Sequence, residues 1–210
     1  MVTEKIRPIV KKNIEGNPVY KFLGRIGVGP DFFSWLAIVW AVFGAFFILE
    51  NRLWWALPFV VLAMMWDGID GAYARTLGRT TRFGAYIEGM IDLYVEVIVM
   101  LAVIVWQYPI EGALVMILSM MLSYAKPRLA QVIPAKDVDW PGIGEKFQRR
   151  LFFLIAMFVH LIFPSFEIAG KIMDTFSIMM YLLAIMVFIG GIQRIMYAKK
   201  LIKEYEKGMK

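Results

Sequence analysis

Long runs of apolar residues, separated by short polar stretches, dominate the pattern along this chain. An α-helix rises 1.5 Å per residue, so about 20 residues cross a hydrocarbon core about 30 Å thick. Six runs are long enough, and they predict transmembrane helices at roughly 32–50, 53–74, 84–106, 110–133, 149–166 and 175–195. We therefore expect an all-α integral membrane protein with six transmembrane helices.

The polar segments around these runs divide the chain into three regions. Residues 1–30 form a juxtamembrane segment, 31–196 a six-helix membrane domain, and 197–210 a basic cytoplasmic tail. Apolar residues at helical spacing among lysines predict an amphipathic helix in the interface near the N-terminus, with a frayed polar tail as the alternative. These apolar residues are Ile6, Ile9, Val10 and Ile14.

Composition narrows the class of protein further. Of the 210 residues, 60% are hydrophobic and 19% are charged, whereas an ordinary soluble domain has about 45–50% apolar and about 25% charged residues. This excludes a water-soluble enzyme and a disordered chain. The chain has no cysteine, which excludes disulfides, thiolate metal sites and cysteine nucleophiles.

The basic residues predict the orientation in the membrane, because Lys and Arg stay on the cytoplasmic side. With six spans, 21 of the 23 basic residues lie on the side of the two termini, and only Arg52 and Lys171 lie on the other. Both termini are therefore expected to be cytoplasmic. The net charge of +6 suits anionic lipid headgroups, and no soluble basic module exists that would bind nucleic acid.

Four acidic residues interrupt the second and third apolar runs at their cytoplasmic ends. Asp67 and Asp70 share one helix face, and Glu88 and Asp92, four residues apart, share another. Because uncompensated carboxylates would repel one another, we expect divalent cations there, and an oxygen-only ligand set suits Mg²⁺ or Mn²⁺. The alternative is a structural polar cluster, but neighbouring small residues such as Gly71 leave space for a ligand.

These residues resemble the signature of the CDP-alcohol phosphotransferases. The run reads Asp67-x₂-Asp70-Gly71-x₂-Ala74-Arg75-x₈-Gly84-x₃-Glu88-x₃-Asp92, and it matches the signature at every position but one, the family having Asp where Glu88 stands. Before the first span, Gly29-Pro30-Asp31-x₂-Ser34 is similar to the family's Pro-Asn-x₂-Thr segment. The segments 123–128 and 144–149, with Gln193-Arg194, resemble those of members that use inositol phosphate, the phosphatidylinositol-phosphate and archaetidylinositol-phosphate synthases.

The resemblance implies a membrane enzyme of phospholipid biosynthesis. It would transfer a phosphoalcohol group from a CDP-linked lipid donor to an acceptor hydroxyl and release CMP. By position, Asp67, Asp70, Glu88 and Asp92 would hold two metal ions, with Asp92 as the catalytic base. The residues expected to face the CDP donor are Pro30, Asp31, Ser34, Gly71, Ala74, Arg75, Thr81 and Gly84. The active site would lie at the cytoplasmic face, and a homodimer is an open possibility.

Glu88 departs from the family pattern, and three outcomes stay open for it. Its extra methylene moves the carboxylate roughly 1.5 Å from the usual position, and such metal sites tolerate little misplacement. The site would then be normal with a repositioned helix, would hold a single metal ion, or would be inactive.

A second basic group concerns the acceptor. Cations at three span ends predict a phosphorylated acceptor, with inositol phosphate favoured, because Arg binds phosphate through two parallel hydrogen bonds. The candidates are Lys126, Arg128, Arg149 and Arg194. Lys146 and Arg150 are interpreted as ordinary cytoplasmic charge, and His160 as a histidine packed within the bundle.

Other functions are open at this point. A phosphatidylglycerophosphate-type enzyme, or one that acts on soluble polyol phosphates, would carry the same acidic signature. A scaffold without catalysis is another alternative. A cation or proton transporter would use the same carboxylates, but transporters place such acids near the midplane and show repeated halves, and this chain does neither.

Overall fold

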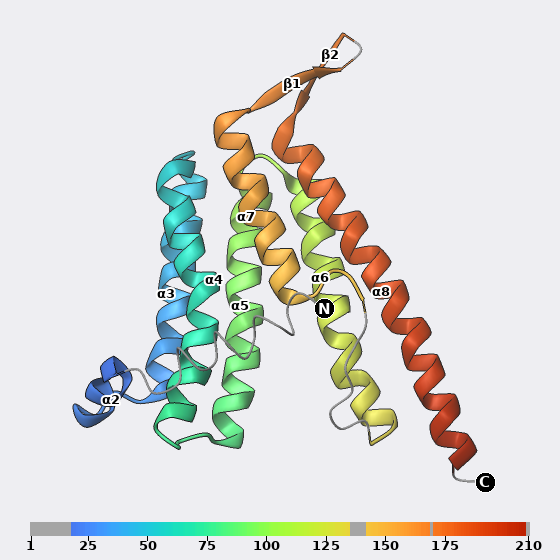
Figure 1. Cartoon of the computed structure of the whole chain (residues 1–210). Helices are drawn as coiled ribbons and strands as arrows, with labels where there is room; N and C mark the ends of the chain where they lie inside the picture. The colour runs from blue at the N-terminus through green and yellow to red at the C-terminus, as the bar shows by residue number, and fades with distance from the viewer. Residues whose placement is uncertain (1–17, 135–141, 169, 209–210) are drawn as a thin grey trace.

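The computed structural model describes residues 18–134, 142–168 and 170–208, and it is mainly helical (Figure 1). The expected interfacial helix at 6–14 lies outside the described residues. The elements are α2 (Pro18–Arg25), α3 (Pro30–Leu49), α4 (Leu53–Thr76), α5 (Arg82–Trp106), α6 (Pro109–Val132), α7 (Lys146–Ile162), β1 (Ser165–Ile168), β2 (Lys171–Asp174) and α8 (Thr175–Gly208).

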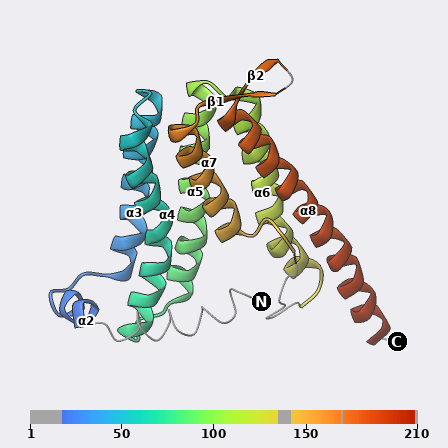
Figure 2. The same ribbon diagram turned by 45° about the horizontal axis from the view of Figure 1, so that its top comes forward.

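The helices form a bundle in which α3 packs against α4 and α5, α6 packs against α5 and α8, and α7 contacts α4 and α8 (Figure 2). Small residues allow close approaches between neighbouring helices. A Cβ atom on Gly44 of α3 would lie 2.8 Å from Val60 of α4, and one on Gly112 of α6 would lie 2.7 Å from Ile104 of α5. Because such distances are below van der Waals contact, these glycines set the spacing between the helices.

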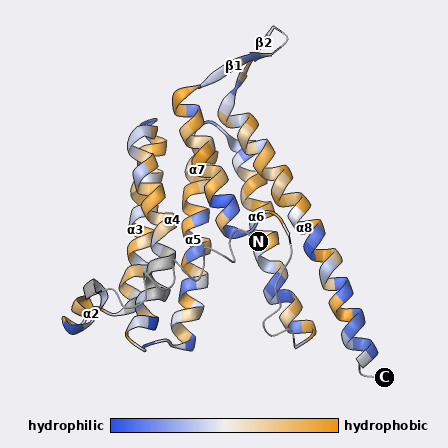
Figure 3. Cartoon of the chain, viewed as in Figure 1, coloured by the Kyte–Doolittle hydropathy of each residue, from blue (hydrophilic) through white to orange (hydrophobic). Residues whose placement is uncertain are grey.

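Four helices of the described residues are long and apolar enough to cross a membrane, which supports an integral membrane protein. They are Phe32–Leu49, Arg82–Trp106, Pro109–Val132 and Thr175–Gly208. The apolar part of α4, Leu53–Trp66, is shorter, and α7 has 17 residues, so the count of six spans stays a prediction. Hydrophilic residues gather toward the end of the bundle where α7 begins and α8 ends (Figure 3).

The fifth apolar run differs from the prediction at both ends. Helix α7 covers Lys146–Ile162 rather than 149–166, and an antiparallel hairpin follows it. Pro164 cannot continue a helix with a hydrogen-bonded N–H, and Gly170 takes the positive φ of +77° that the turn requires. The all-α prediction is therefore wrong for residues 165–168 and 171–174.

Asp174, at the end of the hairpin, joins several elements at this end of the bundle. One of its carboxylate oxygens accepts a hydrogen bond from the Ser177 backbone N–H at 2.8 Å, and the other accepts one from the Tyr108 hydroxyl at 3.0 Å. Burial and the neighbouring Asp174 carboxylate raise the pKa of Tyr108, so the phenol stays a donor. His160 Nδ1 lies 3.9 Å from Asp174 among the rings of Trp106, Tyr108 and Phe176, which confirms that this histidine is packed within the bundle.

The last helix is longer than the apolar run that predicted it. Helix α8 has 34 residues and continues to Gly208, so most of the expected basic tail is helical. Residues 192–207 contain no Gly or Pro that would end a helix, and Lys200 lies 3.9 Å from Glu204 one turn away.

Candidate active site

The turn between α4 and α5 joins the two helices that carry the predicted acidic residues. Gly78 has a φ of +63° in this turn, a conformation that glycine adopts without strain. Thr81 then caps α5, because its hydroxyl oxygen accepts from the Gly84 backbone N–H at 2.9 Å. Thr81 and Gly84 were both expected at the donor, and here they fix the start of α5.

Gly71 of α4 lies directly against two other predicted site residues. A Cβ atom at this position would lie 3.1 Å from Nη1 of Arg75 and 3.6 and 3.8 Å from the two carboxylate oxygens of Glu88. The missing side chain therefore gives the Glu88 carboxylate and the Arg75 guanidinium room beside the α4 backbone. The structure thus brings Gly71, Arg75 and Glu88 together.

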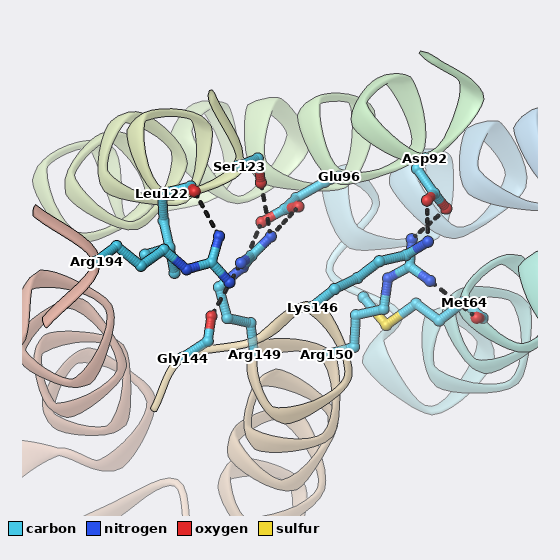
Figure 4. Close-up of polar contacts among 10 residues, drawn as sticks. All are labelled: Met64, Asp92, Glu96, Leu122, Ser123, Gly144, Lys146, Arg149, Arg150 and Arg194. Atoms are coloured by element: carbon cyan, nitrogen blue, oxygen red, sulfur yellow. Dashed lines mark hydrogen bonds and ion pairs between the residues drawn. The ribbon is translucent and has the colours of Figure 1, made fainter. Parts of the chain in front are cut away.

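Asp92 lies one turn beyond Glu88 on α5 and contacts two cations from α7 (Figure 4). Lys146 forms an ion pair with one of its oxygens, and Nη2 of Arg150 donates to the other at 2.8 Å. Arg150 also donates from Nη1 to the Met64 carbonyl on α4 at 3.2 Å. The interpretation of Lys146 and Arg150 as ordinary cytoplasmic charge is therefore wrong: four residues apart, they share the face of α7 that meets Asp92.

Several predicted residues have no described side chain. Asp67, Asp70, Pro30 and Asp31 belong to α3 and α4, but their side chains lie outside the described residues. Among the side chains that are described, no three acidic or histidine residues come close enough to hold a metal ion. The convergence of four carboxylates therefore stays a prediction. Of the other donor candidates, Ser34 is buried and Ala74 is partly buried.

Arg149 is buried at the start of α7, where three elements accept its hydrogen bonds. Glu96 of α5 accepts from Nε at 3.3 Å and from Nη2 at 3.1 Å. The Ser123 hydroxyl of α6 accepts from Nη2 at 3.2 Å, and the Gly144 carbonyl accepts from Nη1 at 2.9 Å. Glu96 was missed in the sequence, although its spacing of four residues from Asp92 continues the acidic face of α5.

Residues 142–144, which precede α7, lie against the backbone of α8. The Gln193 side chain accepts from the Ile143 N–H at 3.0 Å, and a Cβ atom on Gly144 would lie 3.3 Å from the Val187 Cα. We call residues 142–144 the strap. Because the Gly144 carbonyl also accepts a hydrogen bond from Arg149, the strap links α8 to the basic residues of α7.

The remaining acceptor candidates lie in two different settings. Arg194 of α8 donates to the Leu122 carbonyl of α6 at 2.7 Å, and Figure 4 shows it on the same side as Arg149. Lys126 is exposed, and Arg128 is exposed and bonded to Gln131 at 2.9 Å. The structure thus brings Arg149 and Arg194 to one region near the strap, whereas Lys126 and Arg128 lie exposed near the end of α6.

Comparison with known proteins identifies the family. The family description "CDP-alcohol phosphatidyltransferase" matches residues 28–198, which is most of the chain. The chain belongs to the CDP-alcohol phosphatidyltransferase family. As a member of this family it is a membrane-embedded CDP-alcohol phosphotransferase, and the resemblance seen in the acidic signature is confirmed.

Two relatives are similar to this chain over most of its length. The archaetidylinositol phosphate synthase of Pyrococcus horikoshii is 27% identical over 202 residues, which cover 93% of this chain and 96% of that one. The crystal structure of Mycobacterium tuberculosis phosphatidylinositol phosphate synthase with CDP-DAG bound matches with a TM-score of 0.72 and 26% identity. That match covers 86% of this chain and 92% of the other. The same mycobacterial enzyme in complex with manganese and citrate matches with a TM-score of 0.72 and 25% identity, over 86% of this chain and 87% of that one.

Proposed function

We propose that this enzyme transfers a lipid phosphoalcohol group from a CDP-linked donor to a hydroxyl of inositol phosphate and releases CMP. The observation that carries the proposal is the pairing of two charged zones along α5. Glu88 and Asp92 lie beside α4. Arg149 pairs with Glu96 one turn beyond Asp92, and Arg194 lies on the same side as Arg149 (Figure 4). The acidic residues would hold a metal-bound pyrophosphate, and the adjoining arginines have the positive charge that a phosphorylated acceptor requires.

The residues present fit a divalent cation. Glu88 and Asp92 supply carboxylate oxygens from one face of α5, and Gly71 keeps the facing backbone of α4 close to Glu88. Asp67 and Asp70 would complete the ligand set from α4. Oxygen ligands suit Mg²⁺ or Mn²⁺, and the manganese complex of the mycobacterial relative supports this choice. When bound, two such ions would stabilise negative charge on the transferred phosphoryl and on the departing CMP.

Asp92 is the proposed catalytic base. As the acceptor hydroxyl oxygen bonds to the lipid-linked phosphorus, the bond from that phosphorus to the CMP oxygen breaks, and the hydroxyl proton moves to the Asp92 carboxylate. The ion pairs with Lys146 and Arg150 hold this carboxylate between α5 and α7. The two cations also lie where phosphate oxygens of the substrates would reach them.

The donor would lie on the α3 and α4 side of these acids. Arg75 beside Gly71 offers a guanidinium to the pyrophosphate, and the CDP-DAG complex of the mycobacterial relative supports a CDP-linked lipid here. The other donor candidates from the sequence are Pro30, Asp31, Ser34, Ala74, Thr81 and Gly84.

The acceptor phosphate would lie on the α6, α7 and α8 side. Arg149 and Arg194 are the best placed of the four candidates, and the names of the archaeal and mycobacterial relatives support inositol phosphate. Lys126 and Arg128 stay candidates at the exposed end of α6. We further propose six spans with both termini and the active site at the cytoplasmic face, on the basis of the basic residues.

The proposal is tested by CMP release from the purified enzyme in lipid or detergent. The donor is CDP-diacylglycerol or its ether-linked analogue, with Mg²⁺, Mn²⁺ or EDTA. The acceptors are inositol phosphate, glycerol phosphate, free inositol and serine. Metal-dependent release with inositol phosphate is expected. A preference for glycerol phosphate would show that glycerol phosphate, not inositol phosphate, is the acceptor. Equal use of free inositol would show that the basic residues do not bind an acceptor phosphate and are ordinary cytoplasmic charge. No CMP release with any acceptor would refute the transfer reaction.

A further inference from the structure

Glu96 lies on the same face of α5 as Glu88 and Asp92 but outside the acidic signature. Its side chain is 12% exposed, and the Arg149 side chain that it contacts is 6% exposed. Both carboxylate oxygens engage this guanidinium, at 3.3 Å from Nε and 3.1 Å from Nη2 (Figure 4). Two-point pairing of this kind fixes the plane of a guanidinium as well as its position.

The hydrogen bonds of Arg149 leave one of its N–H groups for a ligand. A guanidinium has five N–H groups. Glu96 accepts hydrogen bonds from two of these N–H groups, the Ser123 hydroxyl from a third and the Gly144 carbonyl from a fourth. Within the described part of the chain, the second N–H of Nη1 is the one that these bonds leave for a substrate oxygen.

We propose that Glu96 is a positioning residue for acceptor recognition, holding Arg149 so that Nη1 meets the acceptor phosphate. This inference rests on the proposed function, in which Arg149 binds that phosphate. Without the carboxylate the guanidinium would rotate about its long side chain. Its charge would also be buried without a carboxylate to neutralise it, which favours movement toward water.

The variant Glu96→Gln tests the role because it keeps the volume and one oxygen of the side chain while removing the charge. We expect the KM for inositol phosphate to rise about 10-fold, the effect of losing one charge-assisted contact. The KM for the CDP-linked lipid should change less than about two-fold, because Glu96 does not act on the donor side of the site. Glu96→Asp keeps the charge and should give a smaller rise, so this variant carries the test if Glu96→Gln does not fold.

Two further comparisons separate positioning from a merely structural role. In an Arg149→Lys background, Glu96→Gln should leave the acceptor KM nearly unchanged, because no guanidinium is left to orient. Glu111→Gln is the matched control: its carboxylate accepts from the Ser177 hydroxyl at 2.5 Å and also joins two helices, but at the hairpin end of the bundle. It should leave both KM values unchanged.

The outcomes distinguish this inference from the proposed function. Wild-type enzyme that releases no CMP with inositol phosphate refutes the proposed function and the role of Glu96 with it. Wild-type turnover combined with an unchanged acceptor KM in Glu96→Gln refutes only the role of Glu96. Equal rises in both KM values, or an undiminished effect in the Arg149→Lys background, also overturn it, because they show that Glu96 does not act through Arg149.

Discussion

Replacing Gly190 with alanine should disturb the acceptor side of the site through the strap. Gly190 lies on α8, where a Cβ atom would be 3.1 Å from the Ile143 carbonyl carbon and closer still to its oxygen. Non-bonded carbon atoms prefer a separation of about 3.5–4.0 Å, so the strap would have to move away by on the order of 1 Å. The obstacle is backbone, and no side-chain rotation relieves it.

The magnitude follows from the bonds that such a shift breaks. The Ile143 N–H to Gln193 bond contributes about 1 kcal/mol, and the bond from charged Arg149 to the Gly144 carbonyl about 1.5–3 kcal/mol. Alanine in place of glycine returns up to about 1 kcal/mol of helix propensity. The net loss of stability is therefore about 2 kcal/mol, which corresponds to a fall in Tm of roughly 4–8 °C for a chain of this size.

The assay compares Gly190→Ala with Gly191→Ala. Nothing lies within 4 Å of the Cβ position at Gly191, so alanine there should be neutral or stabilising by up to about 1 kcal/mol. Thermal unfolding in detergent, followed by tryptophan fluorescence, gives the Tm of both variants. CMP release gives the acceptor KM, which should rise for Gly190→Ala alone because Arg149 loses its Gly144 partner.

A Gly190→Ala protein as stable as Gly191→Ala, with an unchanged acceptor KM, would refute this reasoning. It would mean that the strap moves aside without cost and does not position Arg149. A lower Tm with an unchanged acceptor KM would keep the packing argument and reject its link to the site.

Four further predictions concern the chemistry and the topology. Asp92→Asn should lower kcat by orders of magnitude while the protein stays folded, and full CMP release would exclude Asp92 as the base. Glu88→Asp should lower activity if the α4–α5 spacing is adapted to glutamate, and a rise in CMP release would show that glutamate is a defect. Arg149→Ala should raise the acceptor KM by roughly 10- to 150-fold and leave the donor KM nearly unchanged, whereas equal changes in both would contradict acceptor binding. In this cysteine-free chain, Lys171→Cys should react with an impermeant thiol reagent added outside intact cells, and labelling only from the inside would reverse the proposed orientation.

Much of the membrane architecture and the acidic signature could be predicted from the sequence because both depend on local patterns. An apolar run inserts according to its own length and composition, whatever its neighbours are. Helical spacing alone puts Glu88, Asp92 and Glu96 on one face of α5. The adjacency of Gly71, Arg75 and Glu88 followed from the same periodicity, together with a short turn that makes α4 and α5 neighbours.

Only the tertiary structure decided which cation meets which acid. Lys146 and Arg150 contact Asp92, and Arg149 contacts Glu96, across more than 50 residues of sequence. Helical spacing puts Lys146 and Arg150 on one face of α7 and Arg149 on another, but it does not determine which helix each face contacts. That depends on how α7 packs against α4 and α8, and on the glycines that let the strap reach α8. Pairing of charges is a property of distance in space, and side-by-side placement of distant segments arises only when the whole bundle is packed.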